Sequence, residues 1–450
     1  MERKIHQKLC EWKKDEGGKI ALLIDGARRV GKSHSVATFA KTEYKSAITI
    51  DFNNVSADLK HMFYNYLHDL DSFFLYLSAY YKVKLHERKS LIVFDEVQLF
   101  PRARAAIKYL VADGRYDYIE TGSLISIRKN VQDIVIPSEE RHITMHPMDF
   151  EEFLWAMEAE GLMEIIQKHF QEKIPLGQAM HRRIMHYFRQ YLIVGGMPQA
   201  VKAYLDNPDF SRVDQVKRDI LNLYRADMAK YAEGYDMKVR GIFDEIPAWL
   251  GRAEKKIKLS SLQKDARLRN YEDALLWLSD SMIINPCYLA AEPSIGLRMK
   301  MERLTLKCYM ADTGLLISHA FDEKGIVSEE IYRKLLFDKL EINKGMIFEN
   351  IVAQMLAAGG HKLYFYSNYN RTDSSSRMEI DFLIAKSLIN NRHNISPIEV
   401  KSGKNYTLSS LNKFISKYAE QTHTPYLIHA DDLKVENGIV YLRVYMTSML

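Results

Sequence analysis

Long hydrophobic runs are missing from this sequence of 450 residues, and cysteine is scarce. No apolar segment approaches the roughly 20 residues that a membrane-spanning helix needs. The charged N-terminus MERKIHQKLCEWKKDEGGK has no apolar core, so we expect neither a membrane span nor a signal peptide. Cys10, Cys287 and Cys308 are scattered, without the spacing of a metal-binding motif. This pattern predicts a protein of the reducing cytoplasm.

A strong excess of one charge sign is also missing. The formal net charge is only +5, which permits nucleic-acid binding without predicting it, because binding of that kind needs a local basic patch. Apolar residues make up 47% of the chain and charged residues 27%, as in ordinary globular proteins. The length predicts roughly three domains.

The segment LLIDGARRVGKSHSV places a glycine-bracketed turn between an apolar run and a helical pattern. Leu22–Ile24 are typical of a buried strand, and a helix is expected from Ser33 onward. This is the context that a phosphate-binding loop requires: backbone N–H groups surround the phosphates, Lys32 reaches the outer phosphates, and the Ser33 hydroxyl binds Mg²⁺. The residues expected to bind ATP here are Gly26, Ala27, Arg28, Arg29, Val30, Gly31, Lys32, Ser33 and His34.

Two further strand ends supply acidic and polar groups. SLIVFDEVQLFP ends its apolar run at Asp95 and Glu96, at the edge where open parallel sheets bind nucleotides. We expect Asp95 to hold the Mg²⁺ shell and Glu96 to act as the general base on water. Thr121 and Ser123, at the end of the next strand, are expected to sense the terminal phosphate, while Glu120 has no role that the pattern predicts.

The order of the patterns predicts an α/β fold in three parts. Short apolar runs alternate with helical patterns in residues 1–160, which predicts a parallel sheet of the P-loop ATPase kind with helices on both faces. Residues 161–340 are mostly helical, and KLSSLQKDARLRNYEDALLWLSDSMIINPCYL has the outline of a winged helix. Residues 341–450 return to strands and form the third predicted domain.

The predicted winged helix carries acidic residues where a DNA reader would enter the groove. Glu272 and Asp273 would face phosphates, which favours a packing role over groove reading. Gly195, Gly196 and Pro198 are expected to form a junction between helices.

The third predicted domain carries a spaced set of carboxylates and one lysine. Alternation along EIDFLIA and PIEVKSG puts Asp381 on one face of its strand, and Glu399 and Lys401 together on one face of theirs. If the strands pair, Asp381 and Glu399, with Glu349 from the preceding helix, can bind Mg²⁺ or Mn²⁺ while Lys401 orients or deprotonates water. The alternative is a cross-strand salt bridge on a solvated face.

Seven segments follow one another along the chain in this order: GARRVGKSH, IVFDEVQLFP, ETGS, HPMDFEEFL, YLIVGGMP, RDILNLY and KCYMADTGLL. In these segments the chain resembles prokaryotic AAA-type ATPases with an uncharacterised restriction-nuclease-like C-terminal domain of the PD-(D/E)xK kind. The resemblance spans nearly the whole chain. It implies an ATP-binding module, a winged-helix-like middle and a restriction-endonuclease-like α/β domain at the end.

Three functions remain open at this point. The leading hypothesis is an ATPase whose nucleotide state controls a metal-dependent nuclease-like domain acting on DNA. The second is a signalling or defence ATPase that binds a protein partner through a non-cutting nuclease-like fold. The third is a DNA-binding ATPase without cleavage. Assembly of identical subunits in response to nucleotide is compatible with all three.

Overall fold

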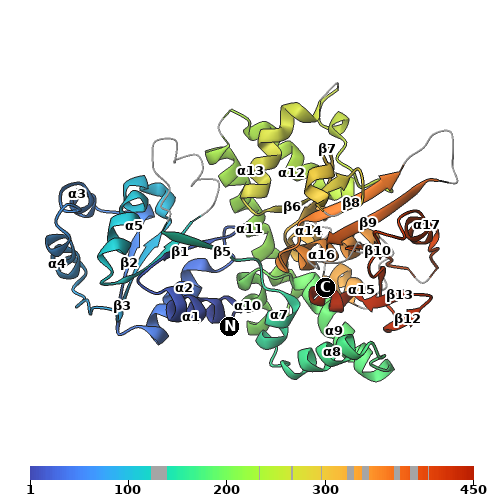
Figure 1. The fold of residues 1–450 in the computed structure, drawn as a ribbon, viewed down its shortest axis with the longest axis horizontal. Coiled ribbons are helices and arrows are strands. Elements are labelled where there is room, and N and C mark those ends of the chain that lie inside the picture. Colours follow the sequence, from blue (N-terminus) through green and yellow to red (C-terminus); the bar gives the residue numbers. More distant parts are fainter. Residues whose placement is uncertain are drawn as a thin grey trace. The chain divides into compact units, whose positions relative to one another are not determined.

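The computed structural model describes residues 1–122, 139–232, 234–264, 267–294, 296–321, 329–336, 344–368, 376–385, 394–403 and 405–450. Contacts divide the chain into two compact units, an N-terminal unit (Met1–His146) and a C-terminal unit (Pro147–Leu450) (Figure 1). The domain limits expected at residues 160 and 340 stay predictions. No helix within the described ranges combines the length and the apolar character needed to cross a membrane.

The N-terminal unit is a parallel sheet with helices on both sides. Its strands have the order β2-β3-β4-β1-β5, and all four pairings are parallel, as the alternating patterns predict. Its helices and strands are α1 (Ile5–Glu16), β1 (Ala21–Asp25), α2 (Lys32–Glu43), β2 (Ser46–Asp51), α3 (Ala57–Asn65), α4 (Leu70–Tyr81), β3 (Ser90–Asp95), α5 (Pro101–Asp113), β4 (Asp117–Thr121) and β5 (Glu140–Thr144).

One face of this sheet carries an aromatic-rich core. Ile50 of β2 and Phe94 of β3 pack in one buried cluster with Phe63 of α3, Phe73 of α4 and Ile107 of α5. Helix α2 packs against β2, β3 and β4 and contributes nothing to this cluster, so it covers the opposite face. The layered packing fixes where β1 and β3 end, and these two ends carry the predicted nucleotide site.

The C-terminal unit joins a helical layer to a mixed sheet of the order β12-β13-β11-β10-β9-β8-β6-β7. Its helices are α7 (Phe150–Ala156), α8 (Gly161–Glu172), α9 (Gln178–Val194), α10 (Pro198–Asp206), α11 (Phe210–Tyr231), α12 (Asp236–Leu250), α13 (Glu272–Asp280), α14 (Thr313–Ala320), α15 (Glu329–Leu336), α16 (Lys344–Ala358) and α17 (Ser409–Lys417). Its strands are β6 (Ile284–Ala290), β7 (Met301–Met310), β8 (Leu363–Asn368), β9 (Met378–Ala385), β10 (Ile395–Val400), β11 (Tyr426–His429), β12 (Lys434–Glu436) and β13 (Ile439–Arg443).

Two features of this sheet differ from the simple alternation that the sequence suggests. Strand β6, from the region predicted to be mostly helical, pairs in parallel with β8 and so belongs to the same sheet as the last strands. Strand β9 carries a β-bulge, because the register against β8 shifts between Ile380 and Leu383. Ile380 and Leu383 both face the core under α17. A bulge re-aims the residues beside it, here Asp381 and Phe382.

The paired glycines form a helix junction, as predicted. Helix α9 ends at Val194 and α10 begins at Pro198. The buried carboxylate of Asp312 accepts hydrogen bonds from Gly196 N (2.6 Å) and from Leu315 N (2.8 Å), which caps α14. A Cβ on Gly196 would lie 2.1 Å from the carbonyl oxygen of Met148. The GGMP and DTGLL elements therefore contact each other and hold helices together.

Candidate functional site

The loop between β1 and α2 has the backbone of an anion cradle. Gly26 (φ 153°), Arg29 (φ 72°) and Gly31 (φ 98°) all have positive φ. A Cβ at Gly26 would lie 2.4 Å from the carbonyl oxygen of Met145, so only glycine fits this close approach. The loop leads into the N-terminus of α2 at Lys32. Free N–H groups and the helix dipole at such a position favour bound phosphate.

The side chain of Lys32 lies within this loop. Its ammonium group donates hydrogen bonds to the carbonyl oxygens of Gly26 (2.8 Å) and Ala27 (3.1 Å), and the residue is 8% exposed. Burial lowers the pKa of Lys32, while the carboxylates of Glu96 and Asp95 oppose that shift. A phosphate in the loop would give this ammonium group an anionic partner in place of neutral carbonyls.

Three oxygen-bearing side chains meet at the ends of α2, β3 and β4. The Ser33 hydroxyl donates to Asp95 Oδ1 at 2.8 Å, and the Thr121 hydroxyl donates to the same oxygen. Hydroxyl and carboxylate oxygens are the hard ligands that Mg²⁺ prefers, so the donor set fits this ion. The structure thus brings together Ser33, Asp95 and Thr121. Ser123, predicted with them, lies outside the described residues.

Glu96 follows Asp95 in a left-handed conformation (φ 55°), which is costly for a residue with a side chain. Its backbone N–H donates to the Thr121 hydroxyl at 3.3 Å, and the Gln98 amide donates to its carboxylate. These bonds hold Glu96 next to the Asp95 cluster. Strained backbone of this kind concentrates at functional sites.

Glu120, which the sequence left without a role, is fully buried beside Glu140 of β5. Burial, and then the neighbouring Glu140, raise the pKa of Glu120 well above its usual range, which favours the protonated form of this carboxyl group. Glu140 keeps its charge against two cations: Arg104 of α5 at 2.9 Å and His142 at 2.6 Å. This cluster joins α5, β4 and β5 and is structural.

The C-terminal unit holds a second cluster of ionisable side chains. Glu349 of α16 is buried, forms an ion pair with Lys255 and accepts a hydrogen bond from Tyr309 (3.1 Å). Burial and the nearby Asp381 raise the pKa of Glu349. Lys307 of β7 contacts two more carboxylates, Glu379 at 2.7 Å and Asp381 at 3.6 Å.

Strands β9 and β10 bring the remaining predicted residues to the same end of the sheet. Ile398 pairs with Phe382, and Asp381 accepts a hydrogen bond from Val400 N at 2.9 Å. Lys401 lies 2.6 Å from Glu399. Burial raises the pKa of Glu399, although Lys401 opposes that shift. The predicted neighbours Asp381, Glu399 and Lys401 therefore lie near one another.

Lys255 and Lys307 are members of this cluster that the sequence reasoning missed. Each carboxylate of the cluster lies against a lysine: Glu349 against Lys255, Glu379 and Asp381 against Lys307, and Glu399 against Lys401. Lys307 was detectable as the single charge in the segment LTLKCYM. Among the described residues, the ligand atoms of Glu349, Asp381 and Glu399 do not form a group within 4.8 Å of one another, so their metal role stays a prediction.

Three family models match separate parts of the chain. Residues 185–324 and 344–446 match two models described as domains of unknown function (DUF8612 and DUF4143), and these descriptions name no activity. No curated protein matches the sequence significantly.

Similar solved structures agree with the chain only loosely. AMPPCP-bound DnaA from Aquifex aeolicus is 11% identical, with 62% of this chain and 79% of that chain covered and a TM-score of 0.26. DNA-bound Drosophila ORC is 13% identical, with 68% of this chain and 90% of that chain covered and a TM-score of 0.28. RuvB from Thermotoga maritima is 13% identical, with 62% of this chain and 86% of that chain covered and a TM-score of 0.26. TM-scores this low do not establish a shared arrangement of the whole chain. Residues 19–154 match the family model described as AAA domain.

Proposed function

We propose that the protein binds ATP with Mg²⁺ at the loop of residues 26–33 and hydrolyses it. The observation that carries this proposal is the hydrogen-bonded group of Ser33, Asp95 and Thr121 beside a loop with the backbone of an anion cradle. It lies at the carboxyl ends of β3 and β4, the usual place for a ligand in a parallel sheet.

Each residue then has a distinct task. The loop N–H groups and Lys32 bind the phosphates, and Ser33 and Asp95 would hold Mg²⁺, which neutralises phosphate charge when bound. Glu96 accepts the proton of the attacking water, and Gln98 orients the Glu96 carboxylate. Thr121 fixes Asp95 through its hydroxyl group.

Phosphate release from ATP tests this proposal. The full chain is incubated with ATP and Mg²⁺, with the same mixture containing a chelator as the control. Metal-dependent release that is lost in Lys32→Ala supports the proposal. Nucleotide binding without release would leave only a binding function, and the absence of both would overturn the proposal.

We propose further that the nucleotide state acts on the C-terminal unit and that this unit binds DNA or a protein partner. In the cutting version, Asp381 and Glu399 would bind Mg²⁺ or Mn²⁺ and Lys401 would assist water. In the non-cutting version the cluster is structural and the unit binds DNA or a protein partner. Pairing of every carboxylate in the cluster with a lysine favours the non-cutting version.

Plasmid DNA separates these versions. Nicking in the presence of ATP and Mn²⁺ that disappears in Lys401→Ala supports cleavage. Intact plasmid, with ATP hydrolysis that rises when DNA is added, supports DNA binding without cleavage. A rate of ATP hydrolysis that does not change when DNA is added favours a protein partner. A mass measurement with and without nucleotide tests assembly of identical subunits.

A further inference from the structure

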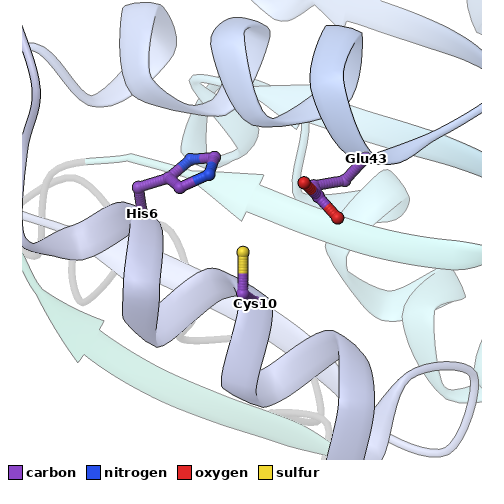
Figure 2. Close-up of side chains that lie close together, drawn as sticks. All are labelled: His6, Cys10 and Glu43. Atoms are coloured by element: carbon purple, nitrogen blue, oxygen red, sulfur yellow. The ribbon is translucent and has the colours of Figure 1, made fainter.

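Three side chains with metal-binding atoms converge between the first two helices. His6 and Cys10 are four residues apart on α1, which puts them on one face of that helix, and Glu43 is the last residue of α2. Figure 2 shows all three side chains pointing toward one another across the gap between the helices. One ligand atom from each lies within 4.8 Å of the other two, and within the described part of the chain no other group of three does so.

We propose that His6, Cys10 and Glu43 form a zinc site that joins α1 to the end of α2. Sulfur, imidazole nitrogen and carboxylate oxygen are the ligand types that Zn²⁺ takes, usually with tetrahedral geometry. Bonds of about 2.0–2.3 Å to such an ion bring ligand atoms roughly 3.3–3.8 Å apart. Ligand atoms that lie no more than 4.8 Å apart therefore need to move closer by at most about 1.5 Å. Three protein ligands leave a fourth position for water.

The surroundings of the site include another cation. The ammonium nitrogen of Lys13 lies 3.5 Å from Glu43 Oε2, so a bound metal ion would share this carboxylate with Lys13. The rings of His6 and Phe39 meet edge-on with their centroids 5.8 Å apart, and this contact limits the orientation of the His6 ring. Cys10 is partly exposed, whereas Cys287 and Cys308 are buried. On binding, the Cys10 thiol releases its proton to solvent as the sulfur–metal bond forms.

The position of this site in the fold means that metal binding would stabilise the N-terminal unit. Helix α2 begins at the nucleotide loop and ends at Glu43, and α1 packs against α2. A metal bound to both helices stabilises the N-terminal unit against unfolding, since it binds the folded chain in preference to the unfolded one. This inference does not depend on ATP hydrolysis.

Metal titration of the full chain, stripped of metal and free of nucleotide, tests the site. In a titration where the protein competes with a chromophoric chelator for Zn²⁺, one equivalent of Zn²⁺ should bind at this site. Zn²⁺ should also raise the melting temperature of the protein. Cys10→Ser, His6→Gln and Glu43→Gln should each lower the affinity by more than about tenfold, because the loss of a second-shell partner alone costs about 10–100-fold. Co²⁺ should give a thiolate charge-transfer band that Cys10→Ser abolishes.

Asp15→Asn is the matched control, because Asp15 is exposed on the same helix and its loss leaves all three ligands in place. Its affinity and melting shift should equal those of the unmodified chain. A second measurement needs no variant: Zn²⁺ should protect Cys10 from alkylation, read by mass spectrometry. Affinity that Cys10→Ser leaves unchanged, or alkylation at the same rate with and without Zn²⁺, overturns the proposal.

Discussion

The ammonium nitrogen of Lys307 lies 3.6 Å from Asp381 Oδ1, in the interior of the C-terminal unit. Lys307 is 1% exposed and also contacts Glu379 at 2.7 Å. Burial alone would lower the pKa of Lys307, but the carboxylates of Glu349, Asp381 and Glu379 outweigh that effect and raise it. The lysine is therefore charged, and it supplies the positive charge that a metal ion would otherwise bring to these carboxylates.

Replacing this lysine should be costly. Lys307→Met leaves Asp381 and Glu379 without their shared cation, and breaking a buried ion pair costs about 3–5 kcal/mol. Urea denaturation measures the loss in the free energy of unfolding. Lys300→Met is the control, because Lys300 and its partner Glu292 are exposed, and it should cost less than about 1 kcal/mol. Equal stability of Lys307→Met and the unmodified chain would contradict a structural role for the ion pair.

Lys32 should determine nucleotide affinity. Lys32→Ala removes the ammonium group that the loop holds next to the phosphate position. A hydrogen bond to a charged group contributes about 1.5–3 kcal/mol, so ATP affinity should fall by more than about tenfold. Calorimetry with a non-hydrolysable ATP analogue measures it. Lys41→Ala, at the exposed far end of α2, should bind normally. Unchanged affinity in Lys32→Ala would place the nucleotide elsewhere.

Glu96 should affect the chemical step more than binding. Glu96→Gln keeps the shape of the side chain and removes the base, and general-base catalysis contributes about 10²–10⁴-fold. We expect the hydrolysis rate to fall by that factor while affinity for the ATP analogue changes little. Asp95→Asn should instead weaken Mg²⁺ binding, so that hydrolysis needs a higher Mg²⁺ concentration, since it alters the oxygen that Ser33 and Thr121 contact. A Glu96→Gln variant with normal turnover would exclude Glu96 as the base.

The sequence predicted the N-terminal unit well because its signals are local. Apolar runs marked β1 and β3, and the glycines of the loop marked a turn that only residues tolerating positive φ can form. The helix expected from Ser33 begins at Lys32. The contact between Ser33 and Asp95 followed from the rule that parallel strands end at one edge.

The C-terminal unit was harder to predict because its signals are long-range. The parallel pairing of β6 with β8 joins segments about 75 residues apart, and no local pattern encodes such a partner. The bulge at Asp381 breaks the alternation that the strand pattern implies. Lys307 and Lys255 reach the carboxylates from segments that carry no spacing motif. The restriction-endonuclease-like fold stays a prediction.

Glu120→Gln should change how stability depends on pH. Burial beside Glu140 raises the pKa of Glu120 well above its usual 4.5, so folding takes up a proton at this group. The stabilising contribution of that proton is complete below about pH 4.5 and is lost as the pH rises toward the folded-state pKa. In this window the free energy of unfolding falls by about 1.4 kcal/mol for each pH unit. Glutamine is neutral in both states, so the variant should lack this slope.

Urea denaturation at several pH values between 6 and 8 measures the effect, following the transition of the N-terminal unit. The advantage of Glu120→Gln over the unmodified chain should grow steadily with pH, because only the unmodified chain must keep a carboxyl group protonated. Glu87→Gln, an exposed acid of the same unit, should run parallel to the unmodified chain. Parallel curves for Glu120→Gln would mean that Glu120 is ionised in the fold, and Arg104 and His142 would then have to balance two carboxylates instead of Glu140 alone.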